Sequence, residues 1–180
     1  CSQSRGLGDV YKRQSNRFGF TPKRTMQVAQ SLYAREGGGL ITYIRTDSIE
    51  IDEGKVPAVR SQVASMFGED FVQPRNYKNK KEAKNIQEAH GAITPVEISL
   101  VPADAKKILK DDEFKLYQLI WQRTVASQMK DAIFERTTIE FVPAGDESLA
   151  TFSFSDQELI FSGYLEAVSY THLTLPTNGT

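Results

Sequence analysis

A ten-residue segment, residues 39–48, contains a phenol, a guanidinium and a carboxylate within five positions, in Tyr43, Arg45 and Asp47. Side chains alternate between the two faces of an extended segment, so we expect Ile41, Tyr43 and Arg45 to share one face. A phenol with an ordinary pKa of about 10 is almost fully protonated at neutral pH, so a nucleophilic tyrosine needs a base or a positive charge beside it. Arg45 can supply that charge and can hold a phosphate through two parallel hydrogen bonds. The spacing is suited to attack by Tyr43 on a phosphodiester.

A tyrosine two positions before an arginine also fits plain packing, in which a core ring lies beside a solvated charge. The order of the neighbouring residues favours the chemical interpretation. Gly-Leu-Ile-Thr-Tyr-Ile-Arg-Thr-Asp-Ser closely resembles the active-site motif of type IA DNA topoisomerases. The resemblance implies that Tyr43 becomes linked to a DNA 5′ phosphate and that Arg45 stabilises the developing phosphate charge. The activity implied is relaxation of negatively supercoiled DNA by single-strand cleavage, strand passage and religation.

Three further stretches fit the same family in order and rough spacing. Residues 18–33 resemble the helix that precedes the tyrosine motif in bacterial members, and residues 87–95 resemble a downstream histidine motif. Residues 116–129 resemble the long helix that closes the tyrosine-bearing domain. The resemblance covers about residues 15–168.

The resemblance also suggests three accessory residues. His90 occupies the family's position for contacting the DNA phosphate near the cut, although a histidine alone would be read as a surface or helix-end residue. Asp47 is expected to orient Arg45 or to cap the next turn rather than to act as a base. Gln30 is a candidate for a DNA contact or for support of one. The predicted DNA-binding set is therefore Arg45, His90, Asp47 and Gln30, and no residue is predicted to bind a metal.

Some positions depart from the family pattern. Gly91 and Thr94 stand where bacterial members commonly have glutamate and arginine, which weakens any prediction of phosphate contacts by that loop. Ile44 replaces the more usual methionine, and this substitution nearly conserves volume. A topoisomerase III-like enzyme is an alternative within the family. Ile44, where proline is frequent in that branch, and the segment at residues 125–129 favour the other bacterial branch.

The cofactor implied by the resemblance is Mg²⁺, bound by a toprim domain that would precede residue 15 and is not expected in this chain. No ATP is implied, because the tyrosine ester retains the phosphoryl bond. Asp111, Asp112 and Glu113 are not expected to replace the toprim acids, since acidic residues are favoured at a helix start by the helix dipole. The chain alone is therefore predicted not to relax supercoiled DNA.

Both ends of the chain differ from the rest. Residues 4–14 and 168–178 resemble translated sequencing adapters, so residues 1–14 and 169–180 are set aside as artefacts. Ordinary flexible tails are the alternative, and neither interpretation affects the remaining chain.

The composition limits the class of protein. The chain has 180 residues, with 22 lysines and arginines against 23 aspartates and glutamates, and one cysteine, Cys1. A globally basic nucleic-acid binder and a disulfide framework are thus excluded. Any DNA contact has to depend on local charge, such as Lys23, Arg24, Arg45 or the lysines of residues 78–84, which also fit a solvated loop.

The apolar pattern predicts a mainly α fold with a small β component. Thr21 followed by Pro22 is a helix start, and the glycines at 37–39 end that segment. Asp104 and Asp111 can cap two later helices, of which the second is expected to continue to about Ile133. Other elements are expected as helices over residues 54–67 and 81–89 and as strands over residues 137–142, 149–154 and 158–161. The side chains expected in the core are Met26, Ala29, Leu32, Tyr33, Val59, Val63, Met66, Phe67, Tyr117, Ile120, Trp121, Val125 and Met129.

By resemblance, residues 15–134 form a helical tyrosine-bearing domain of the catabolite-activator type, and residues 135–168 begin the β arch domain. The partners implied are single-stranded or negatively supercoiled DNA and the remaining topoisomerase domains, with no membrane and a monomeric full-length enzyme. A cytoplasmic, nucleoid-associated bacterial protein is expected. The competing hypothesis is a non-catalytic helical module that binds nucleic acid or protein and buries Tyr43 in its core.

Overall fold

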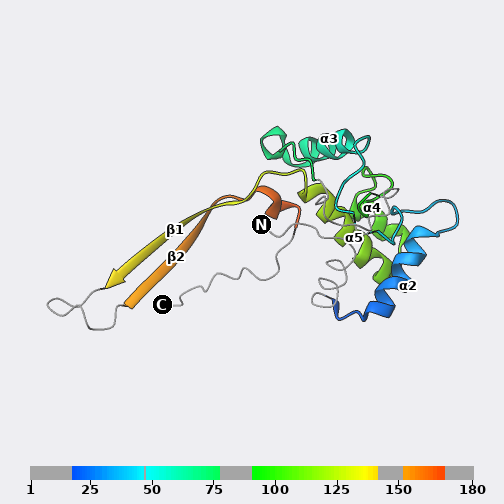
Figure 1. Ribbon diagram of the computed structural model, residues 1–180, viewed down its shortest axis with the longest axis horizontal. Coiled ribbons are helices and arrows are strands. Elements are labelled where there is room, and N and C mark those ends of the chain that lie inside the picture. Colours follow the sequence, from blue (N-terminus) through cyan, green and yellow to red (C-terminus); the bar gives the residue numbers. More distant parts are fainter. Residues whose placement is uncertain (1–17, 47, 78–90, 142–151, 169–180) are drawn as a thin grey trace, which may run out of the picture.

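Four α-helices and a two-stranded antiparallel ribbon form the part of the chain that the computed structural model describes, which is residues 18–46, 48–77, 91–141 and 152–168 (Figure 1). The elements are α2 (Pro22–Tyr33), α3 (Val56–Phe67), the 3₁₀ turn η1 (Glu69–Phe71), α4 (Pro102–Ile108), α5 (Asp111–Ala126), β1 (Ile133–Phe141), β2 (Phe152–Phe161) and the 3₁₀ turn η2 (Gly163–Glu166). The fold is mainly α with a small β component, as predicted. Of the helices in these ranges, none combines the length and apolar character that crossing a membrane requires.

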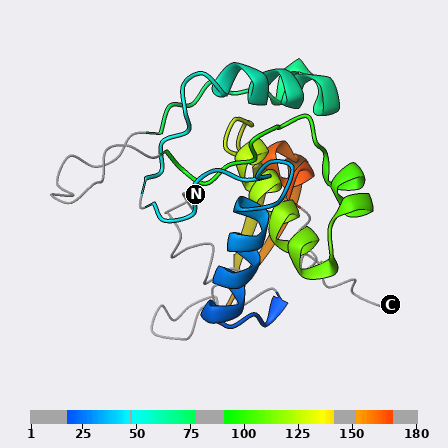
Figure 2. The same ribbon diagram turned by 90° about the vertical axis from the view of Figure 1, so that its right-hand side faces the viewer.

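Helix α2 begins where the sequence predicts. Thr21 caps it by accepting a hydrogen bond from the Arg24 N–H at 3.2 Å, and Pro22 occupies the first helical position. The helix ends at Tyr33, ahead of the glycines. Its buried side chains are Thr25, Val28, Ala29 and Leu32. This face packs against α5, and the two helices lie side by side in Figure 2.

Helix α5 supplies the centre of the core. Every side chain predicted for its buried face is at most 4% exposed, namely Tyr117, Ile120, Trp121, Val125 and Met129. The Trp121 Nε1–H donates to the Ile98 carbonyl at 2.9 Å, and the Tyr117 hydroxyl donates to the Leu100 carbonyl at 2.8 Å. Trp121 is thus a core anchor, as predicted, and the two bonds tie residues 98–100 to the helix. Burial of each such side chain contributes roughly 1.5–3 kcal/mol.

The predicted caps of the last two helices are wrong. The residues that precede α4 and α5 are Val101 and Lys110, while Asp104 and Asp111 lie inside the first turns. Carboxylates are favoured there by the helix dipole, without acting as caps. At the start of α5, Glu113 accepts a hydrogen bond from the Lys110 N–H at 3.2 Å, which satisfies one of the free donors of the helix end.

The predicted carboxyl end of α5 is also wrong, because the helix ends at Ala126 instead of near residue 133. The Ser127 hydroxyl donates to the Thr124 carbonyl at 2.6 Å. Two residues later Met129 forms an antiparallel bridge with Val72. Met129 is still fully buried. Its position therefore fits the apolar spacing of the helix, although the backbone is no longer helical there.

Helix α3 agrees with the prediction in position but buries a narrower face. Val59 and Val63 are buried, whereas Met66 is 46% exposed. Gly68 ends the helix with a φ of +102°, a conformation that side chains with a Cβ rarely adopt. The helix contacts α5 and lies above it in Figure 1.

Strands β1 and β2 form a ribbon that extends away from the helices (Figure 1). Residues 152–154 of one predicted strand and the whole of the next, residues 158–161, belong to the single strand β2, and β1 begins four residues earlier than expected. The Asp156 carboxylate accepts from the Gln157 N–H at 2.8 Å inside β2, where the sequence suggested a turn. Residues 142–151 lie outside the described ranges.

The far half of the ribbon has one apolar and one polar face. Directly opposed residues share a face, and the pairs Ile139–Phe154 and Phe141–Phe152 alternate with Glu140–Ser153 and Thr138–Ser155. The four apolar side chains are 47–71% exposed. An exposed apolar face of this kind is unusual in a monomer of this size.

The near end of the ribbon is joined to the helices by close contacts. The rings of Phe71 and Phe161 have centroids 4.9 Å apart. Gly163, with a φ of +50°, lies so close to Lys130 and Asp131 that a Cβ would be 2.5–2.6 Å from their backbone atoms. The Tyr164 N–H donates to the Lys130 carbonyl at 2.9 Å. Glycine is therefore required where the ribbon returns to the helices.

Polar contacts also join α2 to the start of α5. The Arg24 Nε–H donates to Asp112 at 3.0 Å, and the Ser31 hydroxyl donates to Glu113. Burial of the Glu113 carboxyl raises its pKa, but the hydrogen bonds from Ser31 and the Lys110 N–H and the nearby Arg35 charge outweigh burial and hold the pKa below its usual 4.5. The ionised form of Glu113 is therefore favoured by folding.

We expect Glu113→Gln to lower the free energy of unfolding by about 1 kcal/mol at pH 7. A carboxyl with a lowered pKa stabilises the fold above its unfolded pKa and loses that contribution as the pH falls through the folded pKa. The difference between wild type and variant should thus be full above about pH 5 and shrink at lower pH. Urea unfolding from pH 3 to 7 measures it, with the exposed Glu53→Gln as control. A gap independent of pH would show that the charge of Glu113 is not the cause.

Candidate active site

The segment that carries Tyr43 is paired with residues 94 and 95. Ile41 and Pro95 form an antiparallel bridge, and the Thr42 N–H donates to the Thr94 carbonyl at 2.9 Å. Ile41 is 1% exposed and belongs to the main core. The backbone next to Tyr43 is therefore fixed both by pairing and by burial.

The Thr42 side chain adds a second pair of bonds across the same junction. Its hydroxyl accepts from the Thr94 N–H at 2.9 Å and donates to the Ala92 carbonyl at 3.2 Å. The residue before Tyr43 thus uses both its backbone and its side chain to hold the 92–94 segment.

We expect Thr42→Val to lower the free energy of unfolding by about 1–3 kcal/mol, because the variant leaves a donor and an acceptor without their partner. Thr42→Ser keeps the hydroxyl and is the matched control. Urea denaturation of the two variants makes the comparison. Equal stability of the valine and serine variants would mean that these bonds contribute nothing.

The predicted alternation of faces fails within the tyrosine segment. Ile41 and Ile44 are both 1% exposed, although strict alternation would place them on opposite faces. The chain bends at Ile44 and Arg45, so that Ile44 enters the core. Ile41 consequently does not share a face with Arg45, which is exposed, whereas Tyr43 is half-buried.

The ring of Tyr43 lies against the ring of Tyr33, the last residue of α2. Their centroids are 5.8 Å apart and the ring planes meet at 72°, an edge-to-face arrangement. Tyr33 was predicted as a core residue of α2, but it is 38% exposed and faces the tyrosine segment instead. The sequence did not reveal this partner, because the chain folds back at the glycines of residues 37–39 and only then places Tyr43 beside Tyr33.

Backbone contacts at the glycine turn fix this arrangement. The Leu40 N–H donates to the Leu32 carbonyl at 2.9 Å. Gly39 lies so close to α2 that a Cβ would be 2.3 Å from the Tyr33 carbonyl oxygen. Helix α2 and the tyrosine segment are therefore in direct backbone contact, and Gly39 is required there for space.

Two hydrogen bonds from backbone N–H groups to side-chain hydroxyls follow Arg45. The Thr46 hydroxyl accepts from the Ser48 N–H at 3.0 Å, and the Ser48 hydroxyl accepts from the Glu50 N–H at 3.1 Å. Such bonds stabilise turns in which a hydroxyl replaces a backbone acceptor. They leave the exposed Arg45 at the start of the turn.

Two of the predicted site residues, Asp47 and His90, lie outside the described ranges, as does the helix expected over residues 81–89. Gln30 is exposed on α2 and borders an open hollow between α2 and the start of α5, together with Ser31 and Arg35. The structure thus brings together Tyr43 and Tyr33, and leaves Gln30 one helical turn before Tyr33.

Gly91 and Thr94, two of the three positions expected to depart from the family pattern, have local structural roles. Gly91 lies against Glu50, such that a Cβ would be 2.9 Å from the Glu50 carbonyl oxygen. The Ala92 N–H donates to the same oxygen at 2.7 Å. Thr94 is 4% exposed and belongs to the pairing with Thr42. Gly91 therefore packs against Glu50, and Thr94 is bonded to Thr42 of the tyrosine segment.

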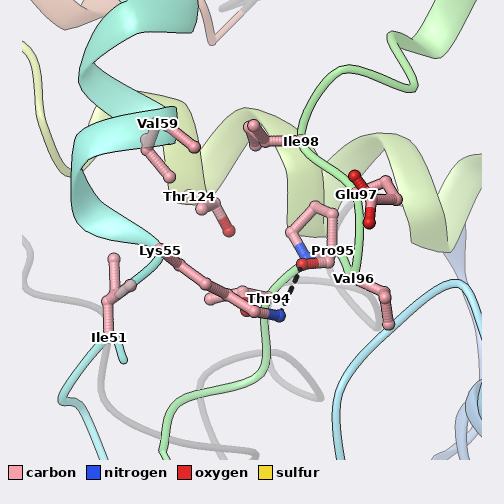
Figure 3. Close-up of a pocket in the computed structure, with 10 residues that line it drawn as sticks. Ile51, Lys55, Val59, Thr94, Pro95, Val96, Glu97, Ile98 and Thr124 are labelled. Atoms are coloured by element: carbon pink, nitrogen blue, oxygen red, sulfur yellow. Dashed lines mark hydrogen bonds between the residues drawn. The ribbon is translucent and has the colours of Figure 1, made fainter. Parts of the chain in front are cut away.

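A small pocket lies beside this support, between the start of α3 and residues 94–98 (Figure 3). The Lys55 ammonium group reaches across it and donates to the Pro95 carbonyl at 3.2 Å. Glu97 is one of the residues that line it. Burial raises the pKa of the nearby Tyr117 to about 12, and the negative charge of Glu97 adds to this rise. The lining is mostly apolar and includes neither Tyr43 nor Arg45, so the pocket is separate from the candidate site.

Within the described ranges, no three histidine, cysteine, aspartate or glutamate side chains come together as a metal site.

Comparison with known proteins supports the motif-based resemblance. Residues 6–176 match a family model described as DNA topoisomerase. DNA topoisomerase 1 of Streptomyces coelicolor is 45% identical over 157 residues, which are 85% of this chain and 16% of that protein. The DNA topoisomerase 1 proteins of Mycolicibacterium smegmatis and Rickettsia bellii are 41% and 38% identical and cover 82% and 83% of this chain, or 16% and 19% of their own lengths. The chain thus spans less than a fifth of these relatives.

A solved structure agrees with the sequence comparison. Full-length topoisomerase I from Thermotoga maritima superposes with a TM-score of 0.75 at 30% identity, over 90% of this chain and 26% of that chain. The residues matched by the family model, 6–176, include the segment around Tyr43. The chain belongs to the bacterial DNA topoisomerase family.

Proposed function

We propose that this chain is the tyrosine-bearing part of a type IA DNA topoisomerase, which relaxes negatively supercoiled DNA through a covalent tyrosine intermediate. The observation that carries the proposal is the geometry around Tyr43. A half-buried tyrosine and an exposed arginine stand on a backbone that is fixed by Ile41, Thr42 and Gly39. A reacting group held on a rigid frame loses little entropy when it reaches its target.

In the proposed reaction the Tyr43 hydroxyl oxygen attacks a DNA phosphorus atom. The bond from phosphorus to the 3′ oxygen breaks, and a 5′-phosphotyrosyl ester forms. The phenol releases one proton and the leaving 3′ oxygen takes one up, so no net proton is consumed. The freed 3′ hydroxyl reverses the step after the other strand has passed. One phosphodiester is exchanged for another, so no ATP is consumed. The exposed Arg45 guanidinium can hold two phosphate oxygens while negative charge develops.

The remaining site assignments are part of the proposal. His90 contacts a phosphate near the cut, Asp47 orients Arg45, and Gln30 supports a DNA contact. Mg²⁺, bound by a toprim domain outside the matched residues, would supply charge near the phosphate. The helices form a domain of the catabolite-activator type and the ribbon begins the arch domain, while the full-length enzyme acts as a cytoplasmic monomer on nucleoid DNA.

The proposal is tested by the polarity of the covalent adduct. We would build a chimera in which residues 15–168 of this chain replace the matching segment of the Streptomyces coelicolor relative. The chimera is mixed with single-stranded DNA labelled at the 3′ end or at the 5′ end, and the protein is denatured. The label at the 3′ end should remain with the protein, and the label at the 5′ end should leave on a fragment ending in a 3′ hydroxyl.

The opposite polarity would overturn the type IA assignment. A folded chimera that binds DNA without forming any adduct would overturn the catalytic proposal and leave the nucleic-acid-binding module as the better description. Thermal unfolding and DNA binding of the same chimera distinguish this result from misfolding.

A further inference from the structure

We propose that Tyr33 is a positioning residue for Tyr43, and that its ring holds the Tyr43 phenol in the orientation from which its oxygen attacks phosphorus. The inference rests on the proposed function and assigns a role to a residue outside the predicted catalytic set. Tyr33 acts through Tyr43 and is not expected to touch the reacting phosphate itself.

The first observation is the contact between the two rings. Edge-to-face aromatic pairs prefer centroid separations of roughly 4.5–7 Å, and the 5.8 Å and 72° found here lie within that preferred geometry. A ring placed against a half-buried phenol favours the rotamers of that phenol that keep the contact. The contact is large enough to bias the rotamers of Tyr43 roughly threefold to tenfold.

The second observation is that Tyr33 is itself held in place. It is the last residue of α2, and that helix is anchored by the burial of Val28, Ala29 and Leu32. The backbone of Leu32 bonds that of Leu40, and Gly39 touches the Tyr33 carbonyl. A rigid ring can direct a neighbour, whereas a mobile one cannot.

The third observation is the exposure of Tyr33. At 38% it is among the exposed large apolar side chains of the described ranges, and it lies on a helix whose packed face is already complete with smaller residues. Its ring therefore adds little to the core. The burial it does have includes the contact with Tyr43, which favours a role at the site over a role in stability.

The test uses the chimera defined above and compares Tyr33→Leu with Tyr33→Phe. Single-turnover adduct formation at saturating single-stranded DNA gives the rate constant of cleavage, and a separate titration gives the dissociation constant. Tyr33→Leu should slow cleavage about threefold to tenfold with an unchanged dissociation constant, and Tyr33→Phe should keep the rate within about twofold of wild type because the ring is kept. Met66→Ala, which removes an exposed apolar side chain from α3, is the control and should match wild type.

A spectroscopic measurement on the 180-residue chain tests the contact directly. In the NMR spectrum of tyrosine-labelled protein, the ring protons of Tyr43, assigned by their loss in Tyr43→Phe, should shift in Tyr33→Leu and stay in place in Tyr33→Phe. A merely structural role for Tyr33 would move the unfolding midpoint without this selective change.

Cleavage by Tyr33→Leu at the wild-type rate would overturn the inference while leaving the proposed function intact. Equal slowing in the leucine and phenylalanine variants would overturn it too, since the hydroxyl would then matter instead of the ring. A wild-type chimera that forms no adduct would overturn the proposed function, and the inference about Tyr33 with it.

Discussion

Tyr43→Phe is expected to abolish the covalent DNA adduct while leaving the protein folded. Phenylalanine keeps the ring that packs on Tyr33 and removes the oxygen that would attack phosphorus. A nucleophile that is deleted cannot be replaced by binding energy, so the adduct should fall below detection. Loss of the hydroxyl costs at most about 1 kcal/mol of stability. The measurement is adduct trapping with 3′-labelled single-stranded DNA in the chimera, together with urea unfolding of the chain.

Tyr33→Phe is a closely matched control, because it removes a phenol oxygen from the ring that faces Tyr43. It should retain adduct formation. Adduct formed by Tyr43→Phe at a level near wild type would rule out Tyr43 as the nucleophile. Under the binding-module hypothesis the substitution would cost at most about 1 kcal/mol of stability, and the wild-type chimera would form no adduct either.

Gly39→Ala should have the second large effect. Its Cβ would be 2.3 Å from the Tyr33 carbonyl oxygen, and neither partner can move freely, because the Leu40 N–H is bonded to Leu32 and Ile41 is bridged to Pro95. Overpacking against fixed backbone costs typically about 1–3 kcal/mol, and more where nothing relaxes. We expect a loss of at least about 2 kcal/mol in urea unfolding, and a loss of adduct formation in the chimera because the displacement reaches Tyr43.

Gly54→Ala is the control for this substitution. The nearest atom to its Cβ, at 3.0 Å, is a carboxylate oxygen of Asp52, which accepts from the Gly54 N–H at 2.8 Å and has to shift only slightly to make room. The variant should unfold within about 0.5 kcal/mol of wild type. If Gly39→Ala were as stable and as active as Gly54→Ala, the close contact of α2 with the tyrosine segment would have no energetic importance.

Features encoded by short stretches of sequence were predictable. Thr21 and Pro22 fixed the start of α2, Gly68 the end of α3, and the spacing of Tyr117 and Trp121 the buried face of α5. In each case the cause lies within a few residues along the chain, as a cap, a positive φ or a helical period.

Features decided by contacts across the chain were not predictable. Helix α5 ended early because Met129 pairs with Val72, and the apolar period could not distinguish that bridge from another helical turn. The extended geometry expected around Tyr43 was interrupted because Ile44 enters the core. Of the candidate site, the motif identified Tyr43 and Arg45 as candidates, but the contact with Tyr33 depends on how the glycine turn folds back.

The ribbon has a consequence for handling the protein in solution. Each of its two strands has an outer edge of backbone donors and acceptors, and its far half presents Ile139, Phe141, Phe152 and Phe154 to water. An unpaired strand edge next to an exposed apolar face can pair with the same edge of another copy of the chain. This self-association increases with protein concentration. The charged residues nearby, Glu140 and Asp156, lie on the ribbon itself and oppose that pairing through repulsion between copies, which salt screens. Low protein concentration and low ionic strength are therefore the conditions under which the chain on its own should remain dispersed.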